Sequence, residues 1–437
     1  MLYAASTFFL LQSMSVPSFI DRAIYGDWYG KGGDKLTLTL NLLAIFTSLF
    51  LFWSGTRKMR VARFNRVLPL AAASFLLISV LWSVDPRVTL TQGAAYFFVV
   101  LGAIGLVDVL DGDAVIELAA LICGLSAAAS IVQFFVFPEP GDFRGIFPHK
   151  NVLGEVMAAG VLTALHGMRV RSGRRLRYVS ITALCTIVGL MSKSTTSALT
   201  IIIFFWLDLL GKFYFRPGST RVLGISLAIV SVPVALFFMM NGDLIFDLAG
   251  KDRSFSGRTL IWPHVIDKIG QSPLLGWGFC AFWSPENPLA LQIAEAIRGE
   301  DNWFTFMIVE AHNGLLEFLL EIGFIGTSLF MFLLIRNFAI ALKCLNSSGR
   351  QFGLTSVILL IGILVNAFSE EVLLAGGQVW TSLFFLMGFI CEQKLWLART
   401  ARRQGMVGSG PHRPLVSRGP PQHAVSGAAT APTYRHH

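Results

Sequence analysis

The residues best suited to chemistry lie in and beside one polar segment, residues 241–311, which separates long apolar runs. The segment holds nine Asp/Glu and five Lys/Arg. Arg258 lies near its start and His312 directly follows its end. The planar guanidinium group of Arg258 donates two parallel hydrogen bonds and keeps its charge, which suits it to hold a phosphate. Imidazole takes up a proton most readily near neutral pH, so His312 could act on a hydroxyl group.

Three polar residues follow His312 at helical spacing. Asn313, Glu317 and Glu321 lie at i, i+4 and i+8, and both acids are inside an apolar run. Ionisable groups in such a run usually face a bundle interior or a water-filled cavity, because lipid is a costly environment for them. We therefore predict that this face supports a site at His312. The alternatives are structural: an interfacial histidine, and glutamates paired with Lys or Arg of a neighbouring helix.

Two further clusters supply cations, at residues 143–151 and 192–197. The first precedes an apolar run and contains Asn151, and the second lies between two closely spaced runs. Each cation alone would be an ordinary residue of the lipid–water interface, and an arginine there often extends toward lipid phosphates. Together, four cations could neutralise a diphosphate: Arg144, Lys150, Lys193 and Arg258. A third motif, Asp111-Gly112-Asp113, has a metal-binding spacing but lies away from these clusters, so we give it little weight.

The composition is that of a membrane protein. The chain has 437 residues, of which 54% are hydrophobic and 14% charged, with a mean hydropathy of +0.64. Soluble globular chains carry about 25% charged residues. The five cysteines form no Cys-x-x-Cys pair, and no phosphate-binding loop or dinucleotide fingerprint occurs. We therefore predict no metal and no cofactor.

Apolar runs of the length that crosses a bilayer predict an all-α polytopic protein with about twelve transmembrane helices. The large polar segment then connects the ninth and tenth helices. The predicted spans are residues 4–20, 36–53, 67–83, 92–109, 114–137, 151–168, 177–192, 195–211, 221–240, 312–335, 352–368 and 378–397.

The distribution of basic residues predicts the orientation. Basic residues are concentrated in four connections that fall on one side of the membrane if there are twelve spans: residues 54–66, 169–177, 212–221 and 336–350. Positively charged loops stay in the cytoplasm, so both termini are expected there and residues 241–311 on the far side. Residues 1–397 form the predicted membrane domain. Residues 398–437 form a basic tail with too little apolar surface to fold.

Several short motifs around the polar segment occur in an order typical of one family. They are Arg144-Gly145-Ile146-Phe147-Pro148-His149-Lys150-Asn151, Ser192-Lys193, Ser256-Gly257-Arg258, Pro273-Leu274-Leu275-Gly276-Trp277-Gly278, His312-Asn313 and Glu321-Ile322-Gly323. From about residue 143 to residue 330 the chain resembles the O-antigen ligase/polymerase superfamily, most closely the ExoQ-type exopolysaccharide polymerases.

The resemblance implies metal-independent transfer of a glycan from undecaprenyl diphosphate to a hydroxyl acceptor at the periplasmic face of the bacterial inner membrane. Arg258 would hold the diphosphate, and His312 would serve as base or orienting residue. Where the family commonly has a second arginine, this chain has Lys193, a point charge rather than a planar fork. Arg144 could compensate. The implied partners are the lipid-linked oligosaccharide, the bilayer and other polysaccharide assembly and export proteins, with no nucleic acid.

The function predicted from the sequence is polymerisation of lipid-linked oligosaccharide repeats by a membrane glycosyltransferase. One alternative is a ligase of the same architecture, which transfers the glycan to a lipid core or a protein. A more distant alternative is a transporter or lipid flippase, which would be expected to show internal repeats and broken helices around a midplane site. No clear internal repeat is present in the sequence.

Overall fold

The computed structural model describes most of the apolar part of the chain and part of the polar segment. The described residues are 1–13, 34–56, 66–136, 141–216, 218–224, 226–227, 258–300, 310–368, 370, 372–373 and 379–403. The helices are α1 (Leu2–Ser13), α3 (Asp34–Thr56), α4 (Val67–Ile78), α5 (Pro86–Val109), α6 (Gly112–Val136), α7 (Lys150–Val170), α8 (Arg175–Met191), α9 (Thr195–Tyr214), α12 (Arg258–Gln271), α13 (Pro288–Glu300), α14 (Gly314–Leu345), α15 (Arg350–Ala367) and α16 (Val379–Arg403).

The prediction of an all-α membrane protein is confirmed. Five of the described helices are long and apolar enough to cross a membrane: α5, α6, α9, α14 and α15. Most of the other predicted spans coincide with helices of the described chain, although several of these are shorter or less apolar. The predicted span at residues 221–240 lies almost wholly outside the described residues. Twelve crossings and the side of the membrane on which the polar segment lies remain predictions.

Side chains at the helix starts explain where several helices begin. Asp85 caps α5 by accepting hydrogen bonds from the backbone N–H groups of Arg87 and Val88, and Pro86 follows at the first helical position. Asn313 caps α14 in the same way, accepting from Leu315 and Leu316. Asn313 therefore has a structural role at the start of the helix that follows His312.

Tyr96 of α5 lies at the centre of the packing between helices. Its ring contacts Phe279, Phe330 and Phe385 edge-on, and its hydroxyl group donates to the carbonyl oxygen of Leu373 at 2.9 Å. These partners come from the polar segment, from α14, from α16 and from the connection before α16. Edge-on aromatic pairs add to the stability that burial provides. A single buried ring thus links the polar segment to the membrane helices.

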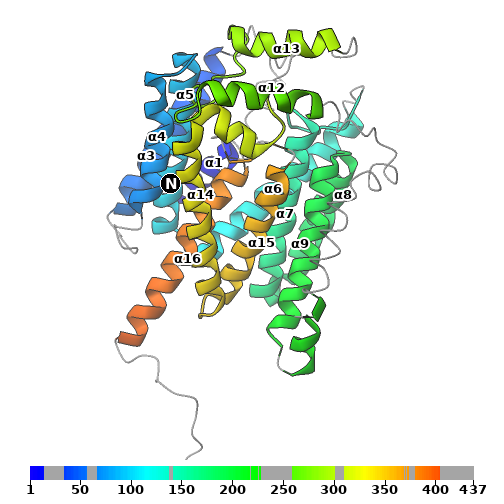
Figure 1. The fold of residues 1–437 in the computed structure, drawn as a ribbon. Helices are drawn as coiled ribbons and strands as arrows, with labels where there is room; N and C mark the ends of the chain where they lie inside the picture. Colours follow the sequence, from blue (N-terminus) through cyan, green and yellow to red (C-terminus); the bar gives the residue numbers. More distant parts are fainter. Residues whose placement is uncertain are drawn as a thin grey trace, which may run out of the picture. The chain divides into compact units, whose positions relative to one another are not determined.

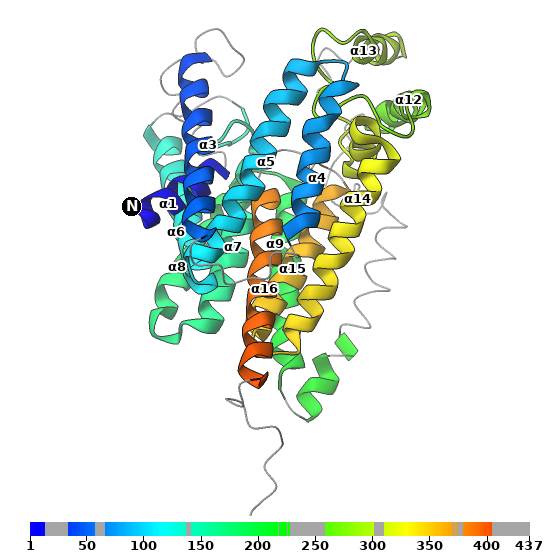
Figure 2. The same cartoon turned by 90° about the vertical axis from the view of Figure 1, so that its left-hand side faces the viewer.

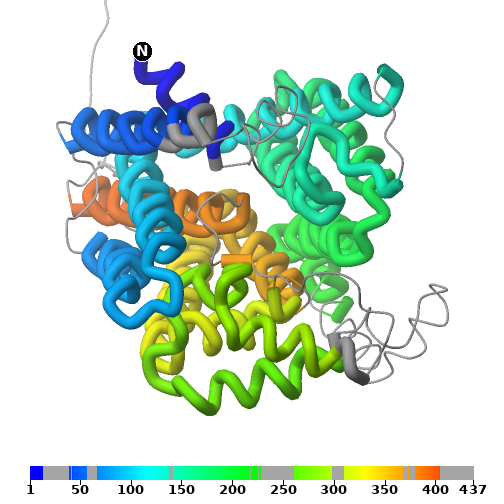
Figure 3. Tube along the Cα trace, turned by 90° about the horizontal axis from the view of Figure 1, so that it is seen from above, coloured from blue at the N-terminus to red at the C-terminus, as the bar shows by residue number. Residues whose placement is uncertain are grey.

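The described part of the polar segment folds into two helices that lie across the end of the bundle. Figures 1 and 3 show α12 and α13 running crosswise to the membrane helices, and Figure 2 shows both close to α4 and α14. They bury a small apolar core of their own, which includes Ile261, Val265, Phe282 and Ile293. Helix α12 begins at Arg258, and α13 lies in a stretch for which the sequence predicted no structure. This end of the bundle is called the loop end below.

Two of the motifs that carried the family resemblance pack against each other. Helix α14 breaks at Gly323, where φ is 62°. The segment 273–278 binds the freed backbone groups: Trp277 and Gly278 donate to the carbonyls of Leu320 and Glu321, and Phe324 donates to that of Pro273. A Cβ atom at Gly276 or Gly323 would lie 2.4 Å from backbone carbon of the opposite segment, so both positions require glycine.

The chain divides into two compact units, residues 1–398 and residues 399–437. Of the second unit, the structure describes the last turn of α16, which continues to Arg403, past the predicted end of the span at residue 397. The remainder of the predicted basic tail lies outside the described residues.

Candidate active site

Three ionisable side chains meet at the loop end, and we name them the acid–histidine cluster: Glu310, His312 and Glu370. The Nδ1 atom of His312 lies 2.8 Å from Oε1 of Glu310 and 3.9 Å from Oε2 of Glu370. The side chain of His312 is 31% exposed, whereas that of Glu370 is only 9% exposed. One imidazole therefore faces two carboxylates at a place that solvent or a substrate can reach.

The backbone of His312 is in an unusual conformation, with φ at 51°. A residue other than glycine adopts this left-handed region rarely, and the strain costs about 1–3 kcal/mol where the surroundings enforce it. Such strain is concentrated at active sites and ligand clamps. In this conformation the Nδ1 atom of His312 lies beside Glu310.

Hydrogen bonds hold the backbone of the preceding residue, Ala311, on both of its polar groups. The backbone N–H of Ala311 donates to Oε2 of Glu317 at 2.7 Å, and its carbonyl accepts from Nε1 of Trp262 at 3.1 Å. The second oxygen of Glu317 accepts from Nε1 of Trp283 at 2.7 Å. We name Trp262, Trp283 and Glu317 the Ala311 clamp. Glu317 thus binds an indole and a backbone amide, whereas the structural alternative predicted a lysine or arginine as its partner.

The two histidines at this end have pKa values that move in opposite directions. Burial by itself lowers the pKa of His312, but Glu310 and Glu370 outweigh burial and raise it to about 9. Burial also lowers the pKa of His149, and in this case it prevails over the same two carboxylates. At neutral pH His312 therefore carries a proton and His149 is neutral. Groups whose environments separate their pKa values in this way are candidates for acid and base roles.

Helix α7 contributes the neighbouring polar groups. His149 caps the helix, since its Nδ1 accepts from the backbone N–H of Asn151 at 3.3 Å, and this bond occupies the nitrogen that could otherwise take up a proton. The side-chain amide of Asn151 donates to Oε1 of Glu370 at 2.9 Å. Glu155, one turn further, is buried within electrostatic reach of Glu370 and Glu310. Asn151 thus orients the carboxylate that faces His312.

Of the predicted diphosphate ligands, Lys150 and Lys193 both lie near Asp142. Lys150 forms an ion pair with Asp142 at 2.7 Å, a partner that the sequence analysis did not identify. Lys193 is exposed, has φ at 56°, and is close enough to lower the pKa of Asp142 after the larger effect of Lys150. Arg144 is partly buried and donates to the carbonyl of Pro148 at 3.5 Å. The backbone of Arg258 begins α12, and the position of its side chain lies outside what the structure describes.

Glu321, the last of the predicted supporting residues, belongs to the break in α14. Its side chain is 2% exposed and its carbonyl accepts from Gly278. Glu321 thus belongs to the joint between α14 and segment 273–278.

Sequence reasoning missed Glu370, Glu310 and the two tryptophans of the clamp. Glu370 follows α15, more than fifty residues after His312 in the chain, so no local spacing links them. Glu310 lies two residues before His312 in the polar segment, but the sequence analysis considered it only as one of the acids of that segment. A search for acids just outside apolar runs would have identified both.

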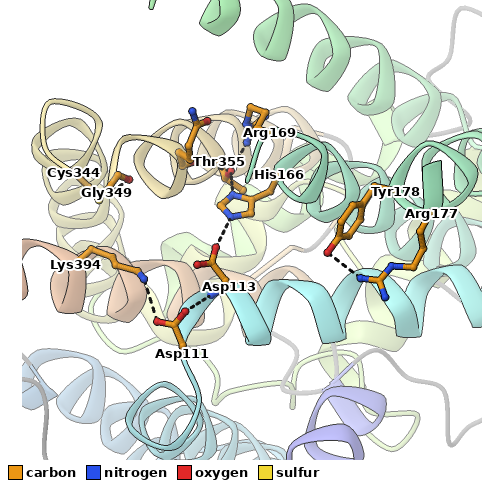
Figure 4. A network of polar contacts seen from close by, with 11 residues as sticks. Asp111, Asp113, His166, Arg169, Arg177, Tyr178, Cys344, Gly349, Thr355 and Lys394 are labelled. Carbon is orange, nitrogen blue, oxygen red and sulfur yellow. Dashed lines mark hydrogen bonds and ion pairs between the residues drawn. The ribbon is translucent and has the colours of Figure 1, made fainter. Parts of the chain in front are cut away.

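The Asp-x-Asp motif lies in a second polar network, shown in Figure 4. Asp111 pairs with Lys394 at 3.1 Å, and Asp113 lies 3.6 Å from Nε2 of His166. The other ring nitrogen of His166 lies 2.7 Å from the hydroxyl group of Thr355. Both carboxylates of the motif thus have protein partners, as expected for a structural role.

The acid–histidine cluster has two chemical capabilities. Its three ligand atoms lie within 4.8 Å of one another, and a set of two carboxylates and one imidazole could hold a divalent cation. The same set also suits proton transfer: the imidazolium of His312 lies between two carboxylates, either of which could accept the proton of a bound hydroxyl group. Metal binding would require His312 to lose the proton that the carboxylates stabilise.

Comparisons with known proteins agree with the motif analysis. Residues 178–331 match the family model described as "O-Antigen ligase". Over 298 residues the chain is 29% identical to the "Exopolysaccharide production protein ExoQ" of Rhizobium meliloti (strain 1021), and the match covers 63% of this chain and 65% of that protein. The matched region spans just under two thirds of that relative. The resemblance to the O-antigen ligase/polymerase superfamily, close to ExoQ, is thereby confirmed. His312 and Glu317 lie inside the family match, whereas Asn151 and Glu370 lie outside it.

Proposed function

We propose that this multi-pass membrane protein polymerises oligosaccharide repeats that are linked to undecaprenyl diphosphate, at the periplasmic face of the bacterial inner membrane. The observation that carries the proposal is the acid–histidine cluster beside the predicted cations at the loop end. The family of the matched region supports glycan transfer as the reaction class. Other assembly and export proteins would receive the polymer, and both termini would lie in the cytoplasm.

In the proposed reaction, the hydroxyl group of the acceptor sugar attacks the anomeric carbon of the donor. The bond between that carbon and the diphosphate oxygen breaks, and the diphosphate leaves with the electron pair. Arg258, Lys193 and nearby cations would stabilise the charge that develops on the leaving group, as fixed charges do in a site of low dielectric. Holding both lipid-linked substrates at one place supplies a further part of the acceleration.

The proton of the attacking hydroxyl group requires an acceptor, and the pKa directions select it. His312 already carries a proton at neutral pH, because its pKa is raised to about 9. A carboxylate of the cluster, Glu370 or Glu310, is therefore proposed to take the proton, and the imidazolium of His312 orients the hydroxyl group and offsets the carboxylate charge. The resemblance allowed His312 to be base or orienting residue, and its raised pKa favours the second role.

Two alternatives differ from the proposal in testable ways. The description of the matching family favours a ligase, which would use the same cluster with a different acceptor. A transporter would use a broken helix to bind its substrate. Helix α14 is broken at Gly323, but the segment 273–278 binds backbone groups freed at the break, which argues against a ligand site there.

The experiment compares Arg258→Ala and His312→Ala with Lys268→Ala and His264→Ala, which remove another cation and another histidine, both within α12. Single lipid-linked repeats and polymer are measured in cells that contain equal amounts of each variant. We expect the first two variants to accumulate single repeats and the controls to make polymer. Polymer of normal length in both Arg258→Ala and His312→Ala would contradict the proposal. If the protein were a flippase, the inactive variants would instead leave single repeats on the cytoplasmic leaflet. If it were a ligase, they would accumulate polymer that is not attached to its acceptor.

A further inference from the structure

A cleft at the loop end lies apart from the acid–histidine cluster. It has a volume of about 620 Å³, and its walls are residues 84–87, before and at the start of α5, and residues 284–289, which lead into α13. Sites for small ligands commonly enclose about 300–1,000 Å³. The cleft is therefore large enough for a bound saccharide.

Hydrogen bonds hold the two walls in a fixed relation. Ser284 donates to Oδ2 of Asp85 at 2.7 Å, which joins the walls directly. The backbone N–H of Val84 donates to the carbonyl oxygen of Trp277 at 3.0 Å. The hydroxyl group of Thr89 donates to the carbonyl oxygen of Phe279 at 2.9 Å. These bonds anchor the wall at α5 to the polar segment at three points. The cleft is thus formed before any ligand binds.

The cleft is joined to the acid–histidine cluster by two adjacent residues. Ser284 holds the cleft through Asp85, and its neighbour Trp283 donates to Glu317, which in turn holds Ala311 beside His312. The covalent step from Trp283 to Ser284 thus connects the two places. This connection places the cleft and His312 on the same supporting residues, so one glycan extending from His312 is a candidate occupant of the cleft.

The chemistry of the walls fits an uncharged saccharide better than a phosphate or an acyl chain. Arg87 and Glu286 are exposed on opposite walls, so a donor and an acceptor both face the cleft, as sugar hydroxyl groups require. Pro86, Pro288 and Leu289 supply apolar surface for the carbon face of a sugar ring. The three charged residues of the walls, Asp85, Arg87 and Glu286, have a net charge of −1, which disfavours binding of a diphosphate. Burying charged groups against an apolar lipid tail is also unfavourable.

We propose that this cleft is a saccharide-binding subsite that holds a sugar of the transferred glycan one or more units away from the reacting bond. The proposal rests on the proposed function, and it names a further site of that function. The sugar could belong to the donor repeat or to the acceptor chain, and both present the same chemistry to the cleft.

The first experiment measures binding to purified full-length protein in detergent. The probes are oligosaccharides of one to three repeats, released by partial hydrolysis of the polysaccharide that the host produces. Glu286→Trp fills the cleft, and Glu295→Trp places the same side chain at an exposed position of α13 as a matched control. We expect Glu286→Trp to weaken binding at least tenfold and Glu295→Trp to leave it unchanged. Equal binding by the wild type and both variants would overturn the proposal, as would no binding to the wild type.

The second experiment measures product length in cells. If the cleft holds the acceptor chain, Glu286→Trp joins the first two repeats at the normal rate and then yields shorter polymer. If it holds the donor repeat, the first coupling is already slowed at least tenfold. Normal length and normal first coupling in Glu286→Trp would exclude the subsite, even if His312→Ala abolishes polymer. Normal polymer in His312→Ala, with an effect of Glu286→Trp, would instead count against the proposed reaction and leave the saccharide site standing.

Discussion

The two polar regions of this protein contain the same kinds of residues but differ in how their charges are matched. In the network of Figure 4, His166 is 2% exposed and lies in regular helix between Asp113 and Thr355. In the acid–histidine cluster, His312 is partly exposed, has a left-handed backbone and faces two carboxylates. The difference suggests that strain and an excess of one charge mark a functional site, whereas closed pairs within helices mark a structural one.

The buried pair between Arg169 and Asp208 extends the structural region. Both side chains are buried, and Lys212 pairs with the second oxygen of Asp208 at 2.7 Å. Removal of one partner of a buried pair leaves an uncompensated charge and costs about 3–5 kcal/mol. Asp208→Ala should therefore lower the thermal stability of the purified protein strongly, while the remaining folded protein keeps its specific activity.

The matched variant is His312→Ala, for which the opposite result is expected. The variant removes the imidazolium that orients the attacking hydroxyl group, and loss of one positioned donor typically reduces kcat by about 10²–10³-fold. The melting temperature should fall less than in Asp208→Ala, because His312 and Glu310 are partly exposed, whereas Arg169 and Asp208 are buried. The contrast between the two regions would be wrong if Asp208→Ala lost specific activity at an unchanged melting temperature. It would also be wrong if His312→Ala lowered the melting temperature more than Asp208→Ala does.

The Ala311 clamp provides a smaller and more specific test. Glu317→Gln keeps the size of the side chain but removes one acceptor, so either Ala311 or Trp283 loses its bond. A hydrogen bond contributes about 0.5–1.5 kcal/mol, and about 1.4 kcal/mol corresponds to a factor of ten in rate, so we expect up to roughly a tenfold fall in kcat with KM nearly unchanged. Trp283→Phe removes only the bond to the indole and should have the smaller effect. A rise in KM alone would indicate that Glu317 contacts substrate rather than positioning His312.

The pH dependence tests which group carries the proton. Because the pKa of His312 is raised to about 9, its ion pairs contribute stability below pH 6.5, and this contribution is lost as the pH rises to about 9. If the imidazolium is required, activity falls above about pH 9. Glu310→Gln removes one of the carboxylates that raise the pKa, so activity should fall at a lower pH. Activity that instead increases through pH 9 would show that neutral His312 is the base.

Chelation is expected to have the smallest effect. The cluster could hold a divalent cation, but the protonated state of His312 opposes binding. Transfer by purified protein should therefore be unchanged after treatment with EDTA. Loss of activity that Mg²⁺, Mn²⁺ or Zn²⁺ restores would assign the cluster to metal binding. Its charges would then be matched by the metal, as those of the network in Figure 4 are matched by protein partners.

The sequence was sufficient for the features that depend on local pattern. Long apolar runs must form helices in a membrane, since no other arrangement of one segment satisfies its backbone, and the described helices follow those runs. The helix that begins at Arg258 and its end before Pro273 were also predictable, because amphipathic spacing and proline act within a few residues. The family could be identified from short motifs for a similar reason, since each motif is contiguous.

Only the tertiary structure brought Glu370 to His312, paired Lys150 with Asp142, and joined segment 273–278 to the break at Gly323. The spacing of these residues along the chain follows no helical or strand periodicity that would indicate a contact. They arise from how the helices pack and where the connections cross the loop end. The charge state of His312 has the same origin, because its pKa depends on two carboxylates, one of which comes from a different part of the fold. Residue types could therefore suggest the chemistry, but the packing of the helices decides which group can take up a proton.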